Sequence, residues 1–189
     1  MRIILASASE RRKELLKSIN IPFEIITSDV EEKLDETKDH YIECMNTAKM
    51  KAEAVFKKIN GDVIVIGSDT IVSFDNKIYG KPKNYEDAYN MLKTFSNNTH
   101  KVITSLCLLI RKDGRTYEEL TYDEGMVSVD MMTDDEIKTW IEENNVYNKA
   151  GAYAIQEGFS KFVKRIEGDF YSIVGLPIHK LYYLLKKYK

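Results

Sequence analysis

The residues best suited to chemistry lie within the first dozen positions of the chain. The apolar run Ile3-Ile4-Leu5 predicts a short strand, which is followed by Ser7 and then by the pair Arg11 and Arg12. Backbone N–H groups at a helix start point beyond the strand, and guanidinium groups grip phosphate oxygens with two parallel hydrogen bonds. This combination predicts a phosphate site. The alternative is that both arginines are solvated first-turn residues, although cations at a helix N-terminus oppose the macrodipole unless an anion is bound.

The helix itself is predicted by apolar residues at positions 15, 16 and 19, which fall on one helical face. Two starts are compatible with the sequence. Ser7 and Glu10 fit a capping box, and Ser9 is a second candidate for the N-cap.

Acidic residues follow two other predicted strands. The apolar run 63–66 predicts a buried central strand that ends at residues 67–70, so Asp69 is expected just past it, with a separate strand over 71–74. Glu31 and Glu32 follow a predicted strand over 23–27. Carboxylates bind Mg²⁺, which usually accompanies a polyphosphate. The alternatives are a turn-forming Asp69 and a solvated acidic loop.

Cations recur where other predicted elements begin or end. Lys51 lies at the edge of a long helix expected from about residue 41 to Gly61, and Lys81 stands in Gly80-Lys81-Pro82. No G-x-x-x-x-G-K-[ST] pattern surrounds Lys81, so it is not a P-loop lysine, and it could be an exposed turn residue. Taken together, the cations and acids predict an enzyme that handles phosphates.

Composition argues against several other classes of protein. A net charge of −2 and a pI near 6.0 provide no global attraction for nucleic acids or anionic membranes, so neither is expected as a partner. His40, His100 and His179 lack ligand spacing and are expected at the surface or hydrogen-bonded. Cys44 and Cys107 are expected as buried free thiols. Without a signal peptide or an apolar run of roughly 20 residues, a cytoplasmic location is expected.

Helices and strands interleave along the chain. Helices are expected over about 85–95, after a capping box of Thr133 and Glu136, and around 181–185, with strands over 101–111 and 116–131 and near 162–163. The long hairpin breaks doubly wound alternation, so an α/β fold with a mixed sheet is expected. A length of 189 residues allows one domain or two small lobes that share a core.

Seven segments along the chain form a recognisable set of motifs: Leu5-Ala6-Ser7-x-Ser9-x-Arg11-Arg12-x-Glu14-Leu15-Leu16, Glu31-Glu32, Ala48-Lys49-x-Lys51-Ala52, Gly67-x-Asp69-Thr70, Gly80-Lys81-Pro82, Lys149-Ala150-Gly151-Ala152-Tyr153 and Gly168-Asp169-x-Tyr171-Ser172-x-Val174-Gly175-Leu176-Pro177. In this order, over nearly the whole chain, they resemble the Maf family of nucleoside triphosphate pyrophosphatases. The resemblance implies one domain over 1–189, with a mixed, strongly twisted central sheet flanked by helices. It also implies an inosine-triphosphatase-like α/β fold and a substrate cleft between two lobes.

The same resemblance implies hydrolysis of a nucleoside triphosphate to the monophosphate and pyrophosphate with a divalent metal, Mg²⁺ or Mn²⁺. Asp69 matches the proposed proton acceptor and a metal ligand, and Glu32 matches an acid near the metal. The implied phosphate-contacting residues are Ser7, Arg11, Arg12, Lys51 and Lys81. The implied cellular role is the clearance of unwanted nucleotides.

The resemblance implies that three residues select the base of the nucleotide: Arg11, Thr70 and Gln156. The Ile155-Gln156 pair resembles the branch of the family that acts on dTTP and UTP, and not the branch that acts on methylated GTP. The amide of Gln156 can match the O4 and N3–H edge of uracil or thymine. The chain departs from the family pattern at Glu10, Ser68 and Asn97, and at Glu157 and Phe159, where small residues are usual after the glutamine. The last two changes bear on the shape of the loop beside the base.

Two other functions are compatible with parts of the sequence. One is a non-catalytic nucleotide-binding regulator that acts on cell division through a protein partner, although the acids Asp69 and Glu32 would serve such binding poorly. The other is a nucleic-acid module, which would need a basic face and stacking aromatics that the sequence does not offer. The oligomeric state stays open, a homodimer included.

Overall fold

The computed structural model describes residues 1–28, 30 and 39–188. The chain forms two compact units. Unit 1 comprises Met1–Asp69, Thr104–Asp123 and Gly175–Lys189, and unit 2 comprises Thr70–Ile103 and Glu124–Val174.

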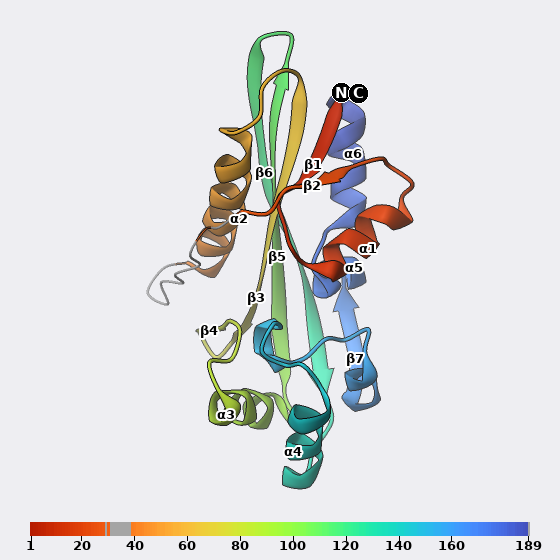
Figure 1. The fold of residues 1–189 in the computed structure, drawn as a ribbon. Helices are drawn as coiled ribbons and strands as arrows, with labels where there is room; N and C mark the ends of the chain where they lie inside the picture. Colours follow the sequence, from red (N-terminus) through yellow and green to blue (C-terminus); the bar gives the residue numbers. More distant parts are fainter. Residues whose placement is uncertain (29, 31–38, 189) are drawn as a thin grey trace. The chain divides into compact units, whose positions relative to one another are not determined.

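The elements, drawn in Figure 1, follow one another as β1 (Arg2–Leu5), α1 (Glu10–Ser18), β2 (Glu24–Ile25), α2 (His40–Phe56), β3 (Val63–Phe74), β4 (Lys77–Tyr79), α3 (Tyr85–Phe95), β5 (Thr99–Lys112), β6 (Arg115–Val129), α4 (Asp134–Glu143), the 3₁₀ turns η1 (Ala150–Ala152) and η2 (Gly158–Phe162), β7 (Val163–Gly168), α5 (Phe170–Val174) and α6 (Ile178–Tyr188). Strands β3, β5 and β6 contribute residues to both units.

The strands form one mixed sheet with the order β2-β1-β3-β5-β6-β7, and β4 pairs with β3. β1 runs parallel to both of its neighbours, with Leu5 opposite Ile25 on β2 and Ile66 on β3. β4 is antiparallel to β3, and β7 is antiparallel to β6. The sheet is twisted and flanked by helices (Figure 1). The expected α/β fold with a mixed sheet is confirmed.

In unit 1 the sheet has an apolar layer on each face because side chains alternate along its strands. On one face, Leu5 and Ile66 pack with residues of α1 and α6, including Leu16 and Leu181. On the other face, residues from the same strands pack with Ala48, Ala52 and Val55 of α2. A sheet covered on both sides explains why 63–66 reads as a continuous apolar run.

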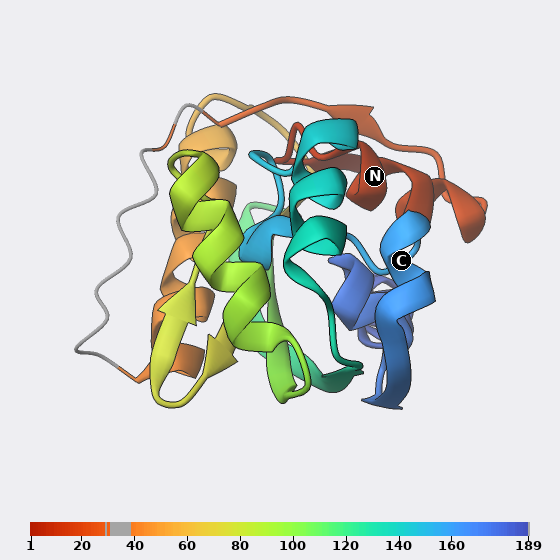
Figure 2. The ribbon, with the colours of Figure 1, turned by 90° about the horizontal axis from the view of Figure 1, so that it is seen from below.

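Unit 2 places α3 and α4 side by side (Figure 2). The α4 start carries the expected capping box, in which the Thr133 hydroxyl accepts the N–H of Glu136 while the Glu136 carboxylate accepts the N–H of Thr133. Helix α3 occupies the expected range. A buried aromatic cluster includes Phe95, Tyr153 and Phe159, whose rings contact one another in pairs.

Several expected boundaries are wrong. β3 is one continuous strand, so Asp69 lies within it and not past its end. The stretch 67–70 has turn-like composition, but strand pairing holds its backbone extended. Of the two predicted helix starts, the one at Ser9 is confirmed, since Ser9 is the N-cap of α1 and the helix begins at Glu10. Ser7 forms no capping box, because its hydroxyl accepts the N–H of Ser9 instead. α2 ends at Phe56, before Gly61.

No helix within the described part of the chain combines the length and apolar character needed to cross a bilayer.

Candidate active site

A buried ion pair joins α2 to β3 in unit 1. The Lys51 Nζ lies 2.7 Å from Asp69 Oδ1, and the two residues are 7% and 5% exposed. Burial of two opposite charges in contact is costly to assemble and strongly destabilising to break by removing one partner. A carboxylate held in this way has a fixed position and charge, which suits a group that must orient a water molecule or hold a cation.

Gly67 allows α2 to approach β3 closely enough for this pair to form. A Cβ at Gly67 would lie 2.2 Å from the backbone oxygen of Ala48 and 2.9 Å from the Cβ of Ala52. Any side chain there would displace α2. Because Lys51 precedes Ala52 on that helix, the spacing between α2 and β3 also sets the Lys51–Asp69 distance.

Cys44 and Ser105 lie beside the same part of β3. The Cys44 Sγ is 3.5 Å from the backbone oxygen of Asp69 and 3.2 Å from Ser105 Oγ, and Ser105 Oγ donates to the Cys44 carbonyl at 2.7 Å. Burial first, and then the nearby Asp69 charge, raise the pKa of Cys44 to about 12. The thiol is therefore neutral at pH 7 and is a packing and hydrogen-bonding group, not a nucleophile.

The loop between β1 and α1 holds the second group of candidate residues. Arg12 Nε donates to the carbonyl of Gly175 at 2.8 Å, and Arg12 Nη1 donates to Ser7 Oγ at 3.3 Å. Ser68 Oγ donates to the same Gly175 carbonyl at 3.3 Å. The guanidinium is thus oriented by protein acceptors before any ligand arrives. Because Ser68 precedes Asp69 in β3, the Gly175 carbonyl connects the arginine to the strand that bears the carboxylate.

Of the remaining candidates in unit 1, Arg11 is partly buried in the first turn of α1, and Glu32 lies outside the described residues. In unit 2, Thr70 is partly buried on β3, whereas Lys81 and Gln156 are exposed. Gly80, next to Lys81, accepts the N–H of Gly151 at 3.0 Å.

The structure therefore brings Lys51 to Asp69 and Arg12 to Ser7. Sequence reasoning missed the parts played by Ser68, Gly175 and Cys44. Ser68 stood out only as a departure from the family pattern, and Gly175 only as part of a motif. The role of Gly175 could not be predicted, because every residue has a backbone carbonyl and the residue type does not indicate which carbonyl accepts a hydrogen bond.

The donor set can be tested for its fit to a divalent cation. Within the described ranges, no three His, Cys, Asp or Glu side chains form a metal-binding group. Mg²⁺ is commonly held by one or two carboxylates together with substrate phosphates and water. Asp69, a buried carboxylate at the contact between α2 and β3, fits that mode as one of the carboxylate ligands.

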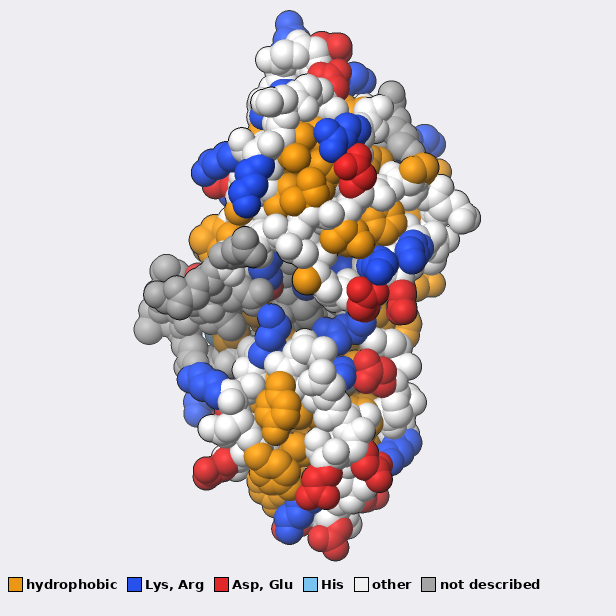
Figure 3. All heavy atoms as spheres, viewed as in Figure 1, with side chains coloured by type: hydrophobic (Ala, Val, Ile, Leu, Met, Phe, Trp, Pro, Cys, Tyr) orange, Lys and Arg blue, Asp and Glu red, His pale blue; other side chains and the backbone are white. Residues whose placement is uncertain are grey.

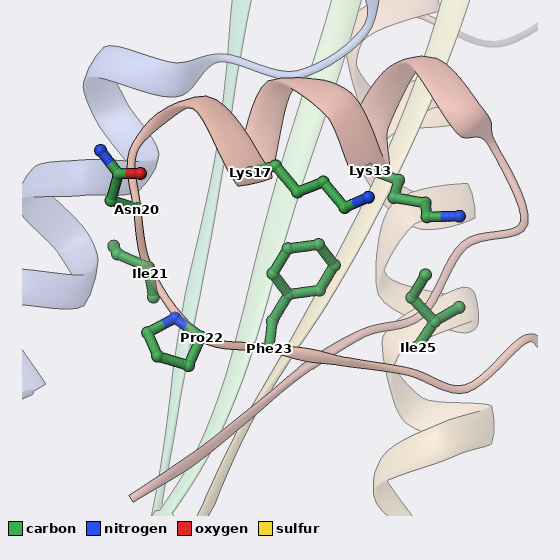
Figure 4. A pocket seen from close by; sticks show the side chains of 7 residues that line it. All are labelled: Lys13, Lys17, Asn20, Ile21, Pro22, Phe23 and Ile25. Atoms are coloured by element: carbon green, nitrogen blue, oxygen red, sulfur yellow. The ribbon is translucent and has the colours of Figure 1, made fainter.

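A hollow of about 500 Å³ on unit 1 lies between α1 and residues 20–25, lined by Lys13, Lys17, Asn20, Ile21, Pro22, Phe23 and Ile25. Figure 4 shows the ring of Phe23 beneath the two lysines. None of the predicted site residues lines this hollow, so it is not the candidate active site. On the face that Figure 3 presents, basic and acidic side chains are interspersed around hydrophobic patches.

Comparison with known proteins gives a match over almost the entire chain. Residues 2–188 match the family model described as "Maf-like protein". The chain is 45% identical to the dTTP/UTP pyrophosphatase of Lachnoclostridium phytofermentans, over 98% of this chain and 94% of that protein. It is 44% identical to the dTTP/UTP pyrophosphatase of Alkaliphilus oremlandii, over 98% and 95%. A nucleoside-triphosphatase / dITP/XTP pyrophosphatase from Mycobacterium abscessus aligns with a TM-score of 0.45 at 15% identity, over 68% and 74% of the two chains.

Proposed function

The chain belongs to the Maf-like protein family, and on that premise we propose that it hydrolyses nucleoside triphosphates, dTTP and UTP first among them, to the monophosphate and pyrophosphate. The relatives named above carry this activity in their names. The observation that supports it in this chain is the buried Lys51–Asp69 pair, in a unit that also holds Arg12 oriented by the Gly175 carbonyl. The chain is thus an enzyme that acts on phosphoric anhydride bonds. We assign this activity to a single domain that spans residues 1–189 and includes both units.

In the proposed reaction, Asp69 orients a water molecule and accepts its proton as the oxygen attacks the α-phosphorus. The bond between the α-phosphorus and its bridging oxygen breaks, and pyrophosphate leaves. Lys51 keeps the Asp69 carboxylate in position through Oδ1. Phosphate oxygens are bound by Ser7 and by the cations, which offset their charge: Arg11, Arg12, Lys51 and Lys81. Most of the rate enhancement then comes from positioning and charge stabilisation.

Asp69 and Glu32 are the residues that would hold a divalent cation, Mg²⁺ or Mn²⁺, together with phosphate oxygens of the substrate. When bound, that cation supplies positive charge to the triphosphate. Base selection is assigned to Gln156, with Arg11 and Thr70. Gln156 is exposed, so its amide is available to a ligand.

We place this activity in the cytoplasm, on free nucleotides, with no nucleic acid or membrane as partner. The chemistry implies a role in removing unwanted nucleotides from the pool. A homodimer is compatible with the proposal.

The decisive experiment supplies purified protein with dTTP, UTP, CTP, GTP and ATP in the presence of Mg²⁺ and separates pyrophosphate from orthophosphate. We expect pyrophosphate, with the highest kcat/KM for dTTP and UTP. A reaction in H₂¹⁸O should place the label in the monophosphate, since attack is at the α-phosphorus. Release of orthophosphate, or a preference for GTP, would contradict the proposal. Tight binding without turnover of any nucleotide would support the regulator instead.

A further inference from the structure

Gln156 follows a stretch of unit 2 that is almost completely buried. Residues 151–155 are all buried, Phe159 is 0% exposed, and Gln156 between them is exposed. The ring of Phe159 stacks on that of Tyr153 with centroids 4.4 Å apart, and the Tyr153 hydroxyl lies 2.6 Å from His100 Nε2. The backbone before Gln156 is therefore anchored by packing.

Hydrogen bonds from residues outside this stretch also hold its backbone. The Trp140 indole N–H donates to the Ala152 carbonyl at 3.1 Å, and the Gly151 N–H donates to the Gly80 carbonyl at 3.0 Å. Gly151 and Ala152 both have positive φ values, 70° and 63°. An alanine in that conformation is strained and persists only where its surroundings impose it.

The residue after Gln156 is held by a different kind of contact. Lys149 is 4% exposed, and its Nζ lies 3.1 Å from Glu157 Oε2 and 2.5 Å from the Asn145 carbonyl. The ion pair connects the two ends of residues 149–157, here called the Gln156 segment. Because Lys149 is buried and Glu157 partly exposed, the lysine is the fixed partner and the glutamate is drawn to it.

We propose that Lys149 and Glu157 are positioning residues that set the direction of the Gln156 amide and so sharpen discrimination between bases. This inference rests on the assignment of base selection to Gln156 in the proposed function. An amide discriminates by donor and acceptor pattern only if its orientation is fixed, since a freely rotating amide can satisfy more than one base edge. Anchoring on both sides of Gln156 supplies that restriction without contact between the ion pair and the base.

Two side chains after Gln156 hold the segment in place. Glu157 and Phe159 both make contacts within this unit that small residues could not make. Phe159 packs against Tyr153 and Trp140, and Glu157 neutralises Lys149. The two residues therefore act together to anchor the segment.

The test compares Glu157→Gln, which keeps an acceptor for Lys149 but removes the charge, with wild type and with Gln156→Ala. We expect the ratio of kcat/KM for dTTP to that for CTP to fall about fivefold to tenfold in Glu157→Gln, since small misplacement of a recognition group costs discrimination. The kcat for dTTP at saturation should change less than about threefold. Amide hydrogen exchange in residues 150–158 should become faster. Glu167→Gln, which removes a pair with Arg165 at 3.0 Å in the same unit, is the matched control and should leave the ratio unchanged.

A double-mutant cycle separates positioning from general destabilisation. In the Gln156→Ala background, Glu157→Gln should have no further effect on the ratio, because the group that it positions is gone. An unchanged ratio in Glu157→Gln, or an equal fall in both backgrounds, overturns the inference while leaving the proposed function intact. A wild type without pyrophosphate release or without preference for dTTP over CTP overturns both. Glu157→Ala removes the hydrogen-bond acceptor as well as the charge, so the same fall in the ratio should be at least as large in that variant. If Glu157→Ala does not fold, the result for Glu157→Gln alone tests the inference.

Discussion

Asp69 is a charged residue in the middle of a strand, where an uncompensated carboxylate would be strongly destabilising. Its neighbour across the layer, Lys51, offsets that cost and leaves the carboxylate rigid. A protein that needed only stability would do as well with two apolar residues of similar volume. The buried pair therefore argues for a functional use of the carboxylate.

Replacing Asp69 with asparagine tests that use. We expect Asp69→Asn to be less stable, because Lys51 loses its counter-charge, but still to fold, because the asparagine oxygen can accept a hydrogen bond from Lys51 Nζ. Its kcat should fall at least about 100-fold, because the amide can neither accept a proton nor bind a cation as a carboxylate does. Steady-state pyrophosphate release measures the loss, and circular dichroism checks the fold. Glu53→Gln, on α2 and paired with Lys57, is a control expected to retain activity. A folded Asp69→Asn with near wild-type turnover would show that the catalytic assignment is wrong.

His100 makes stability depend on pH. Burial lowers the pKa of His100 to about 3, and within the described residues its Nδ1 is a buried polar atom without a hydrogen-bond partner. The unfolded chain takes up a proton near pH 6.5 and the folded chain does not, so stability present above that pH is lost as pH falls toward 3.

The unfolding free energy should thus decrease between pH 7 and pH 5 by about 2 kcal/mol from this residue alone. Urea titrations at both pH values measure the change. His100→Gln should be less stable at pH 7 but should show a smaller loss on going to pH 5. The exposed His179→Gln serves as control and should keep the wild-type dependence. An identical pH dependence in wild type and His100→Gln would refute this origin.

At the scale of elements, regular patterns were predictable and irregular ones were not. Helix α3 follows an uninterrupted apolar stripe, and its bounds match the prediction. The prediction of two strands, over 63–66 and 71–74, in place of the single strand β3 is wrong because Gly67-Ser68-Asp69-Thr70 has the composition of a turn. What keeps it extended is pairing with strands distant in sequence. The Lys51–Asp69 contact is likewise invisible in the sequence, since nothing in the spacing of 18 residues indicates that α2 packs on β3.

Gly67 offers a test of that packing. Gly67→Ala should destabilise the protein by about 1–3 kcal/mol, because the new Cβ would overlap backbone atoms of α2 that cannot move independently. It should also lower kcat by displacing Lys51. Gly158→Ala, whose Cβ would meet the Trp140 ring at an ordinary 3.6 Å, is the matched control. Thermal unfolding of both variants decides the question, and equal melting temperatures would contradict the close-packing argument.

At the scale of the whole molecule, the predicted ligand residues are distributed over both units. Unit 1 carries Ser7, Arg11, Arg12, Lys51 and Asp69, whereas Thr70, Lys81 and Gln156 belong to unit 2. The motifs predicted membership of the Maf-like family, which is confirmed by the match over residues 2–188. The roles of the individual residues remain predictions, and three of those residues belong to the second unit.

Lys81 is assigned to binding of the triphosphate tail. Its replacement should therefore weaken binding of a triphosphate more than binding of a monophosphate. Lys81→Ala should weaken binding of a non-hydrolysable triphosphate analogue about tenfold or more and should change monophosphate binding little. Isothermal titration with both nucleotides measures this difference. Lys83→Ala, an exposed lysine two residues later, is the control. Equal losses for both nucleotides in Lys81→Ala would remove Lys81 from the tail site.

During synthesis on the ribosome, β1 emerges first, but it can complete its packing only after α6 has been synthesised. Leu5 of β1 and Leu181 of α6 share one apolar layer, and Arg12 receives its main-chain acceptor from Gly175, in the same late segment. Until that segment is released, α1 alone covers this face of the sheet, and the apolar residues that α6 would cover stay exposed. Nascent chains that stop before residue 175 should therefore neither close this layer nor bind nucleotide, so the enzyme matures only after most of its length has been translated.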